Sequence, residues 1–144
     1  MSVRSLIGIL GGIVIISFLT QLLEVPLVNA FAPAPITDME GYLAARNQPP
    51  MHVAMLVIAA ITGLLAGYLV AKIAGQYEMQ HAAFATVAQS LLLVRGFAAD
   101  GGAAAVLPAW LKVALVLVTV SAMLLGASVR SRVAKLNPSK EVAP

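Results

Sequence analysis

The sequence predicts an all-α protein: a four-helix transmembrane bundle with both termini in the cytoplasm and a short external helix in the first loop. Hydrophobic residues make up 60% of the 144 positions and charged residues only 10%, whereas soluble domains average about 45–50% and 25%. A water-soluble domain of this size leaves too much surface exposed to hide such an excess. Crossing a bilayer takes about 20 largely apolar residues. Four segments meet that requirement: residues 5–23, 53–73, 81–98 and 107–129.

The first apolar segment, residues 5–23, has features of a secretory signal as well as of a spanning helix. Arg4 precedes it, and Val28-Asn29-Ala30 resembles a cleavage site. The apolar run is longer than the core of a signal peptide, which has roughly 7–15 residues. We therefore interpret it as a helix that spans the membrane.

The first loop, about residues 25–52, is long enough to contain structure of its own. The motif Thr37-Asp38-Met39-Glu40 has the pattern of a capping box and predicts a short helix that continues through Arg46 and ends at Pro49-Pro50. We expect this helix to lie on the outer membrane surface or over the bundle, or to offer a docking surface to a partner.

Residues before a proline favour extended backbone. Three prolines are expected to keep the first half of the loop extended: Pro26, Pro33 and Pro35.

The third apolar segment, residues 81–98, is the weakest of the four because it is rich in alanine and carries Gln89 and Arg95. If it did not cross, the chain would have three crossings and its ends would lie on opposite sides. The preceding link, about residues 74–80, is short, and Gly75 is suited to end a helix. So short a link predicts that the second and third spans are antiparallel neighbours.

The distribution of basic residues predicts the orientation. Positive residues gather on the cytoplasmic side of membrane proteins, so the excess on one side predicts both termini in the cytoplasm. Residues 1–129 then form the membrane domain and residues 130–144 a basic cytoplasmic tail. The net charge of +3 does not indicate nucleic-acid binding, because no basic face with interleaved aromatic residues accompanies it. Six basic residues fall on the cytoplasmic side (Arg4, Lys72, Arg130, Arg132, Lys135, Lys140) and three toward the other (Arg46, Arg95, Lys112).

Small residues at helical spacing predict how the helices pack. Residues four apart lie on one face of a helix, and small residues there let membrane helices approach closely. The longest such row, the small-residue ladder, is Ala59, Gly63, Gly67, Ala71 and Gly75. The same spacing joins Gly8 to Gly12 and Ala122 to Gly126, and the row Ala82, Thr86 and Ser90 is the natural partner expected for the ladder.

One basic residue within the apolar segments needs a partner. Arg95 falls near the outer end of its segment, at a depth similar to that of Glu24 and Asp100. An ion pair between Arg95 and either acid would offset the cost of a guanidinium close to hydrocarbon. We interpret these residues as a structural ion pair, and an ion or substrate pathway is the alternative.

Three other polar residues in or beside the apolar segments have more than one possible function: Gln89, His52 and His81. Gln89 is expected to form a hydrogen bond to a neighbouring helix, and together with His81 and Arg95 it would line a pathway if there is one. His52 and His81 fall on opposite sides of the bilayer, so they cannot ligate one haem or pigment together. Each would ligate alone or in an oligomer, or bond to water and lipid headgroups at the interface. We expect no cofactor and no metal site.

Several short motifs occur along this chain in the same order as in a group of known proteins. With them the chain resembles a group of small, uncharacterised four-span bacterial inner-membrane proteins that share a GY…IAG…HA…PxW…G pattern. The resemblance covers about residues 63–130; it implies four spans and a bacterial inner membrane but no activity. Its motifs are Gly67-Tyr68, Ile73-Ala74-Gly75, His81-Ala82, Pro108-Ala109-Trp110 and Gly126.

These patterns favour a protein that is not an enzyme. The chain has no cysteine, and it lacks paired carboxylates, a nucleophile with a nearby base, and a phosphate-binding glycine loop. We expect a non-catalytic accessory or scaffold subunit that packs against other membrane subunits, or against itself, in the lipid bilayer. The alternatives are a small homo-oligomeric transporter or channel component, and a pigment- or haem-binding protein.

Overall fold

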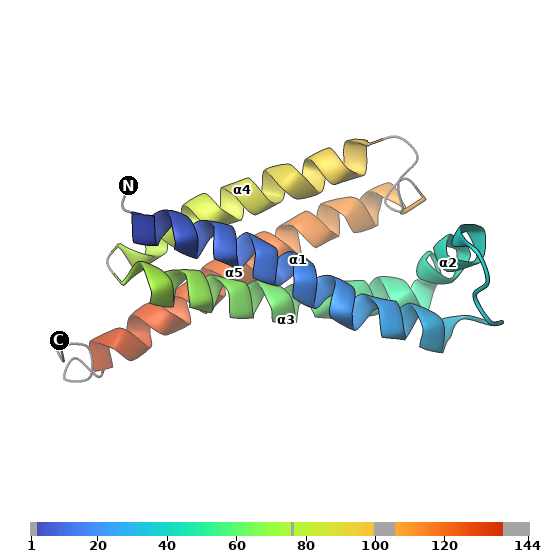
Figure 1. The fold of residues 1–144 in the computed structure, drawn as a ribbon, viewed down its shortest axis with the longest axis horizontal. Helices are drawn as coiled ribbons and strands as arrows, with labels where there is room; N and C mark the ends of the chain where they lie inside the picture. Colours follow the sequence, from blue (N-terminus) through green and yellow to red (C-terminus); the bar gives the residue numbers. More distant parts are fainter. Residues whose placement is uncertain (1–2, 76, 100–105, 137–144) are drawn as a thin grey trace.

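The computed structural model describes residues 3–75, 77–99 and 106–136, which form five helices and no strand. Four long helices lie side by side in alternating directions, so that α1 begins and α5 ends at the same end of the bundle (Figure 1). The short α2 lies at the opposite end. The predicted all-α class is therefore confirmed. The helices are α1 (Val3–Phe31), α2 (Met39–Arg46), α3 (Pro49–Ala74), α4 (Glu78–Ala98) and α5 (Ala109–Leu136).

Three of the described helices are long and apolar enough to cross a membrane: Leu6–Phe31, Pro49–Ala74 and Ala109–Leu136. Helices of this kind indicate a membrane protein. The remaining long helix, α4, covers the segment expected to be the third span and has 21 residues. It is less apolar than the other three and is not among them.

The first helix is longer than predicted, because Pro26 lies inside α1 rather than in an extended loop. The backbone angle of proline fits a helix, and the main cost is one missing hydrogen bond to the carbonyl four residues earlier. Pro26 is exposed, and two residues later Val28 is completely buried against Met51 and Met55 of α3. This packing favours the helix up to Phe31, so the expectation of extended backbone at Pro26 was wrong.

The short helix forms where it was predicted, but its boundaries differ in detail. Its N-cap is Asp38 rather than Thr37, and the Asp38 carboxylate accepts a 2.7 Å hydrogen bond from the Gly41 amide. Pro49 and Pro50 open α3 instead of only ending α2. Proline is well suited to the first turn of a helix, where its missing N–H has no partner to lose.

The small-residue ladder brings α3 and α5 into backbone contact. A Cβ atom added to Gly67 would lie 1.9 Å from the Met123 carbonyl oxygen, and one added to Gly126 would lie 2.1 Å from the Leu64 carbonyl oxygen. At Gly63 the added atom would meet Ala122 Cβ at 2.9 Å. These positions accept no side chain, so the two helices approach as closely as their backbones permit.

The other small residues have different neighbours. A Cβ on Gly12 would lie 2.3 Å from Val70 Cγ2, and one on Gly8 would lie 3.2 Å from Ile73 Cγ2, so these glycines join α1 to α3. Gly75 ends α3 with φ 70°, a conformation that glycine adopts without strain. Ala59 packs in the core beside Leu111 and Leu115, and Ala71 packs with Ala82 of α4 and Ala127 of α5. The main partner of the ladder is therefore α5, whereas α4 had been expected.

Candidate functional site

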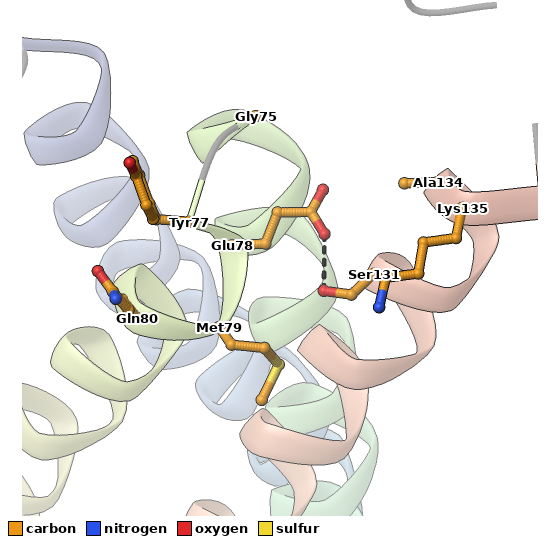
Figure 2. Close-up of a pocket in the computed structure, with 8 residues that line it drawn as sticks. All are labelled: Gly75, Tyr77, Glu78, Met79, Gln80, Ser131, Ala134 and Lys135. Carbon is orange, nitrogen blue, oxygen red and sulfur yellow. Dashed lines mark hydrogen bonds between the residues drawn. The ribbon is translucent and has the colours of Figure 1, made fainter. Parts of the chain in front are cut away.

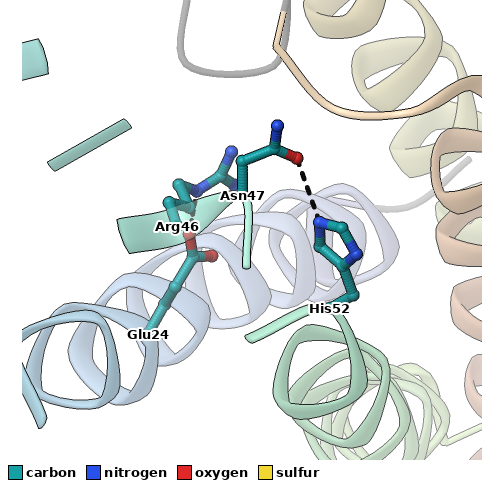
Figure 3. Close-up of polar contacts among 4 residues, drawn as sticks. All are labelled: Glu24, Arg46, Asn47 and His52. Atoms are coloured by element: carbon teal, nitrogen blue, oxygen red, sulfur yellow. Dashed lines mark hydrogen bonds and ion pairs between the residues drawn. The ribbon is translucent and has the colours of Figure 1, made fainter. Parts of the chain in front are cut away.

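A buried ion pair joins α1 to α2 at the end of the bundle opposite the start of α1. Glu24, near the end of α1, is only 4% exposed, and its carboxylate accepts a hydrogen bond from the Arg46 guanidinium (Figure 3). Arg46 is in the last turn of α2. Each charge offsets the cost of burying the other.

Polar and aromatic side chains near this ion pair make further contacts between the helices. His52, in the first turns of α3, makes a 3.0 Å hydrogen bond from Nε2 to the Asn47 amide oxygen (Figure 3). Its ring also makes an edge-to-face contact with Trp110 of α5, with ring centres 5.7 Å apart. Burial raises the pKa of the Tyr42 hydroxyl; the nearby Glu24 carboxylate adds to this rise and Arg46 opposes it.

These contacts fix α2 over the end of the bundle. On the inner side of α2, Ala45 is buried in a core cluster with Val28, Met51 and Leu111. Of the two positions that the sequence allowed for this helix, the structure has the one over the bundle. The His52 ring is therefore engaged in joining α3 to the loop after α2 and to α5.

The residues expected to form the outer ion pair are not brought together. The partner of Glu24 is Arg46 rather than Arg95, and Arg95 is exposed in the last turn of α4. Asp100 lies outside the described residues. The sequence placed Arg46 on a short helix but contained no signal that this helix folds back onto α1.

A second polar cluster joins α4 to α5 at the other end of the bundle, and sequence reasoning missed it. The Ser131 hydroxyl donates a 2.7 Å hydrogen bond to Glu78 Oε2 (Figure 2), and Arg130 Nη2 lies 3.7 Å from Glu78 Oε1. Arg130 is 8% exposed. The sequence contained one indication of this contact, which is the depth of the residues in the membrane. Glu78 begins its helix at the level where α5 becomes polar, at Arg130 and Ser131.

The middle of the bundle contains buried hydroxyl and amide groups. The Thr20 and Thr62 hydroxyls lie 3.3 Å apart, and Thr62 donates to the Ile58 carbonyl at 2.8 Å. Gln89 is 7% exposed, and its Oε1 has no hydrogen-bond partner among the described residues. The expected hydrogen bond from this amide to a neighbouring helix is thus not found for its oxygen.

The three candidates for a pathway do not share one environment. His81 is partly exposed near the start of α4, where its Nδ1 lies 3.0 Å from the Tyr77 carbonyl oxygen. Gln89 is buried in the bundle, and Arg95 is exposed. In the described part of the chain, no three His, Cys, Asp or Glu side chains are grouped so as to bind a metal ion.

Comparisons of this chain with protein-family models, with curated proteins and with solved structures found no match. The fold and its polar clusters therefore define the class of this protein. It is an α-helical bundle with helices of membrane-spanning length, and charged side chains with little exposure join the helices at both ends.

Proposed function

We propose that this chain is a non-catalytic integral membrane protein that serves as an accessory or scaffold subunit of a larger membrane complex. One observation carries the proposal: the buried charges connect helices to each other. Glu24–Arg46 joins α1 to α2, and Glu78–Arg130 joins α4 to α5. With the backbone contact between α3 and α5, these pairs favour a rigid body over a bundle that opens during transport.

The surface that a partner would contact differs from the one that the sequence suggested. Gly63 and Gly67 of the ladder are used inside the bundle, between α3 and α5, so they are not available to another subunit. The outward face of α1 is apolar and exposed, with Val14 and Phe18 about two-thirds accessible. A partner helix would pack on such outward side chains, in competition with lipid.

We also propose that α4 crosses the membrane, which gives four spans with both termini in the cytoplasm. At 1.5 Å per residue its 21 residues are about 32 Å long, close to the roughly 30 Å of the hydrocarbon core. Its outward side is apolar, with Phe84, Val87 and Leu91 exposed. The excess of basic residues at the end where α5 finishes supports a cytoplasmic location for that end, and the resemblance supports a bacterial inner membrane.

The mass of the native assembly tests the accessory role. The protein is extracted from its host membrane with a mild detergent and analysed by native mass spectrometry. We expect a complex with at least one other membrane protein in a defined ratio. A defined homo-oligomer would instead support the transporter or channel component. The observation that favours this alternative is the buried Gln89 Oε1, which has no hydrogen-bond partner among the described residues. A monomer alone would contradict both proposals.

A further inference from the structure

The face of the bundle formed by α4 and α5 carries a row of pockets. Three pockets follow one another along it, with volumes of about 450, 310 and 260 Å³. On α4 these lining residues recur every three or four positions, which places them on one side of that helix. On α5 they do so within each pocket, and seven positions separate Leu124 of one pocket from Ser131 of the next. We call this row the α4–α5 groove. On α4 it is lined by Met79, Ala83, Val87, Leu91, Val94 and Phe97. On α5 it is lined by Lys135, Ser131, Leu124, Val120, Leu117 and Val113.

Five of the side chains that line the largest pocket of the groove are polar or charged, and together with the neighbouring Arg130 the charges at this pocket sum to +1. Figure 2 shows Glu78 with its carboxylate bonded to the Ser131 hydroxyl and Lys135 folded back along α5 toward them. The Glu78 charge is already balanced by Arg130, 3.7 Å away. The Lys135 ammonium therefore adds one positive charge at the pocket, which favours an anionic group there.

The next pocket is apolar although two hydroxyl groups line it. Thr86 donates to the Ala82 carbonyl at 2.7 Å and Ser90 donates to the Thr86 carbonyl at 2.8 Å. Both hydroxyl protons are thus used within α4, and the small Ala83 leaves a depression beside Leu124 of α5. Such a surface suits a hydrocarbon chain, which supplies no hydrogen bonds.

The dimensions match one lipid leaflet. From Met79 to Leu91 the groove follows twelve residues of helix, about 18 Å, and half of the hydrocarbon core is about 15 Å. We propose that the groove binds an anionic phospholipid of the cytoplasmic leaflet. Its phosphate lies next to Lys135, and one acyl chain lies between α4 and α5 as far as Leu91. This inference rests on the proposed crossing of α4 and does not depend on the accessory role.

Native mass spectrometry of the purified, delipidated full chain tests the site. The probes are phosphatidylglycerol and phosphatidylcholine with the same palmitoyl and oleoyl chains, added to the detergent solution. We expect a one-to-one adduct that forms preferentially with phosphatidylglycerol. Lys135→Gln should weaken phosphatidylglycerol binding about fivefold, the factor that one lysine contributes at an anionic surface, and should remove the preference. Ala83→Leu fills the apolar pocket and should weaken binding of both lipids.

Two matched variants serve as controls. Lys72→Gln removes an exposed positive charge at the same end of the bundle, and Ala60→Leu fills a pocket of about 310 Å³ between α3 and α5. Both should bind phosphatidylglycerol as the parent does. Equal binding of the two lipids by the parent, or equal losses in Lys72→Gln and Lys135→Gln, would overturn the proposal. The lipid adduct is scored on the isolated chain, so the result is separate from the search for a partner subunit.

Discussion

At the scale of single residues, the charged side chains that are buried in the described part of the chain, Glu24 and Arg130, lie in contacts between helices. The Glu24 and Arg46 side chains are 5% and 13% exposed. A charge removed from water to this extent is costly unless its partner is present. We therefore expect the pair to help hold α2 in position, whereas the exposed Arg95 of α4 is not expected to contribute.

Replacing Arg46 by alanine tests this assignment. Arg46→Ala leaves the Glu24 carboxylate buried without its guanidinium, and we expect a loss of stability of about 3 kcal/mol. The measurement is the thermal melting temperature in detergent. Arg95→Ala is the matched control and should melt like the parent. A larger loss in Arg95→Ala than in Arg46→Ala would restore the ion pair that the sequence suggested.

At the scale of helices, the contact between α3 and α5 organises the bundle. It is the most extensive contact between two described helices, and Gly63, Gly67 and Gly126 allow it. In lipid, the hydrophobic effect does not drive helices together, so association depends on close packing and on interhelical hydrogen bonds. The loss of a single close contact is therefore expected to have a large effect.

A methyl group at the tightest glycine should separate these helices. In Gly67→Ala the new Cβ would lie 1.9 Å from a backbone oxygen that cannot move alone. We expect a destabilisation of about 3 kcal/mol, at the upper end of the range for overpacking, measured by thermal melting in detergent. Gly11→Ala is the control, because its Cβ would meet nothing within 4 Å. If both variants melt like the parent, α3 and α5 are not in backbone contact.

At the scale of the whole molecule, the four long helices alternate in direction, and α2 covers one end (Figure 1). Because of this arrangement, the sides of the membrane on which the two ends of α4 lie decide how many times the chain crosses. If α4 crosses the membrane, Tyr77 and Ala99 lie on opposite sides of it. If it does not cross, they lie on the same side, and α5 finishes on the outside.

Labelling of single cysteines distinguishes the two topologies, and the chain has no cysteine of its own. Ala44→Cys, Tyr77→Cys, Ala99→Cys and Arg132→Cys are each treated in intact cells with a maleimide that does not cross membranes. We expect labelling at positions 44 and 99, and labelling at 77 and 132 only after the membrane is permeabilised. External labelling at 132 together with protection at 99 would exclude four spans.

Much of the fold followed from local patterns. Long apolar segments predicted the helices, Asp38 and its neighbours predicted the start of α2, and Gly75 predicted the end of α3. The wrong prediction at Pro26 has a non-local cause, because Val28 is buried against Met51 and Met55 of α3 and this packing keeps the turn helical. The polar cluster around Glu78 was missed because its partners lie 52 and 53 residues away in the chain.

The amino-acid order alone determined that the chain forms long apolar helices and that small residues line their sides, because apolar pattern and helical spacing are properties of consecutive residues. The tertiary structure alone decided that α5 meets the ladder, that Arg46 rather than Arg95 pairs with Glu24, and that α2 lies over the bundle. Such choices depend on the rotation and depth of several helices at once, and no local pattern contains that information.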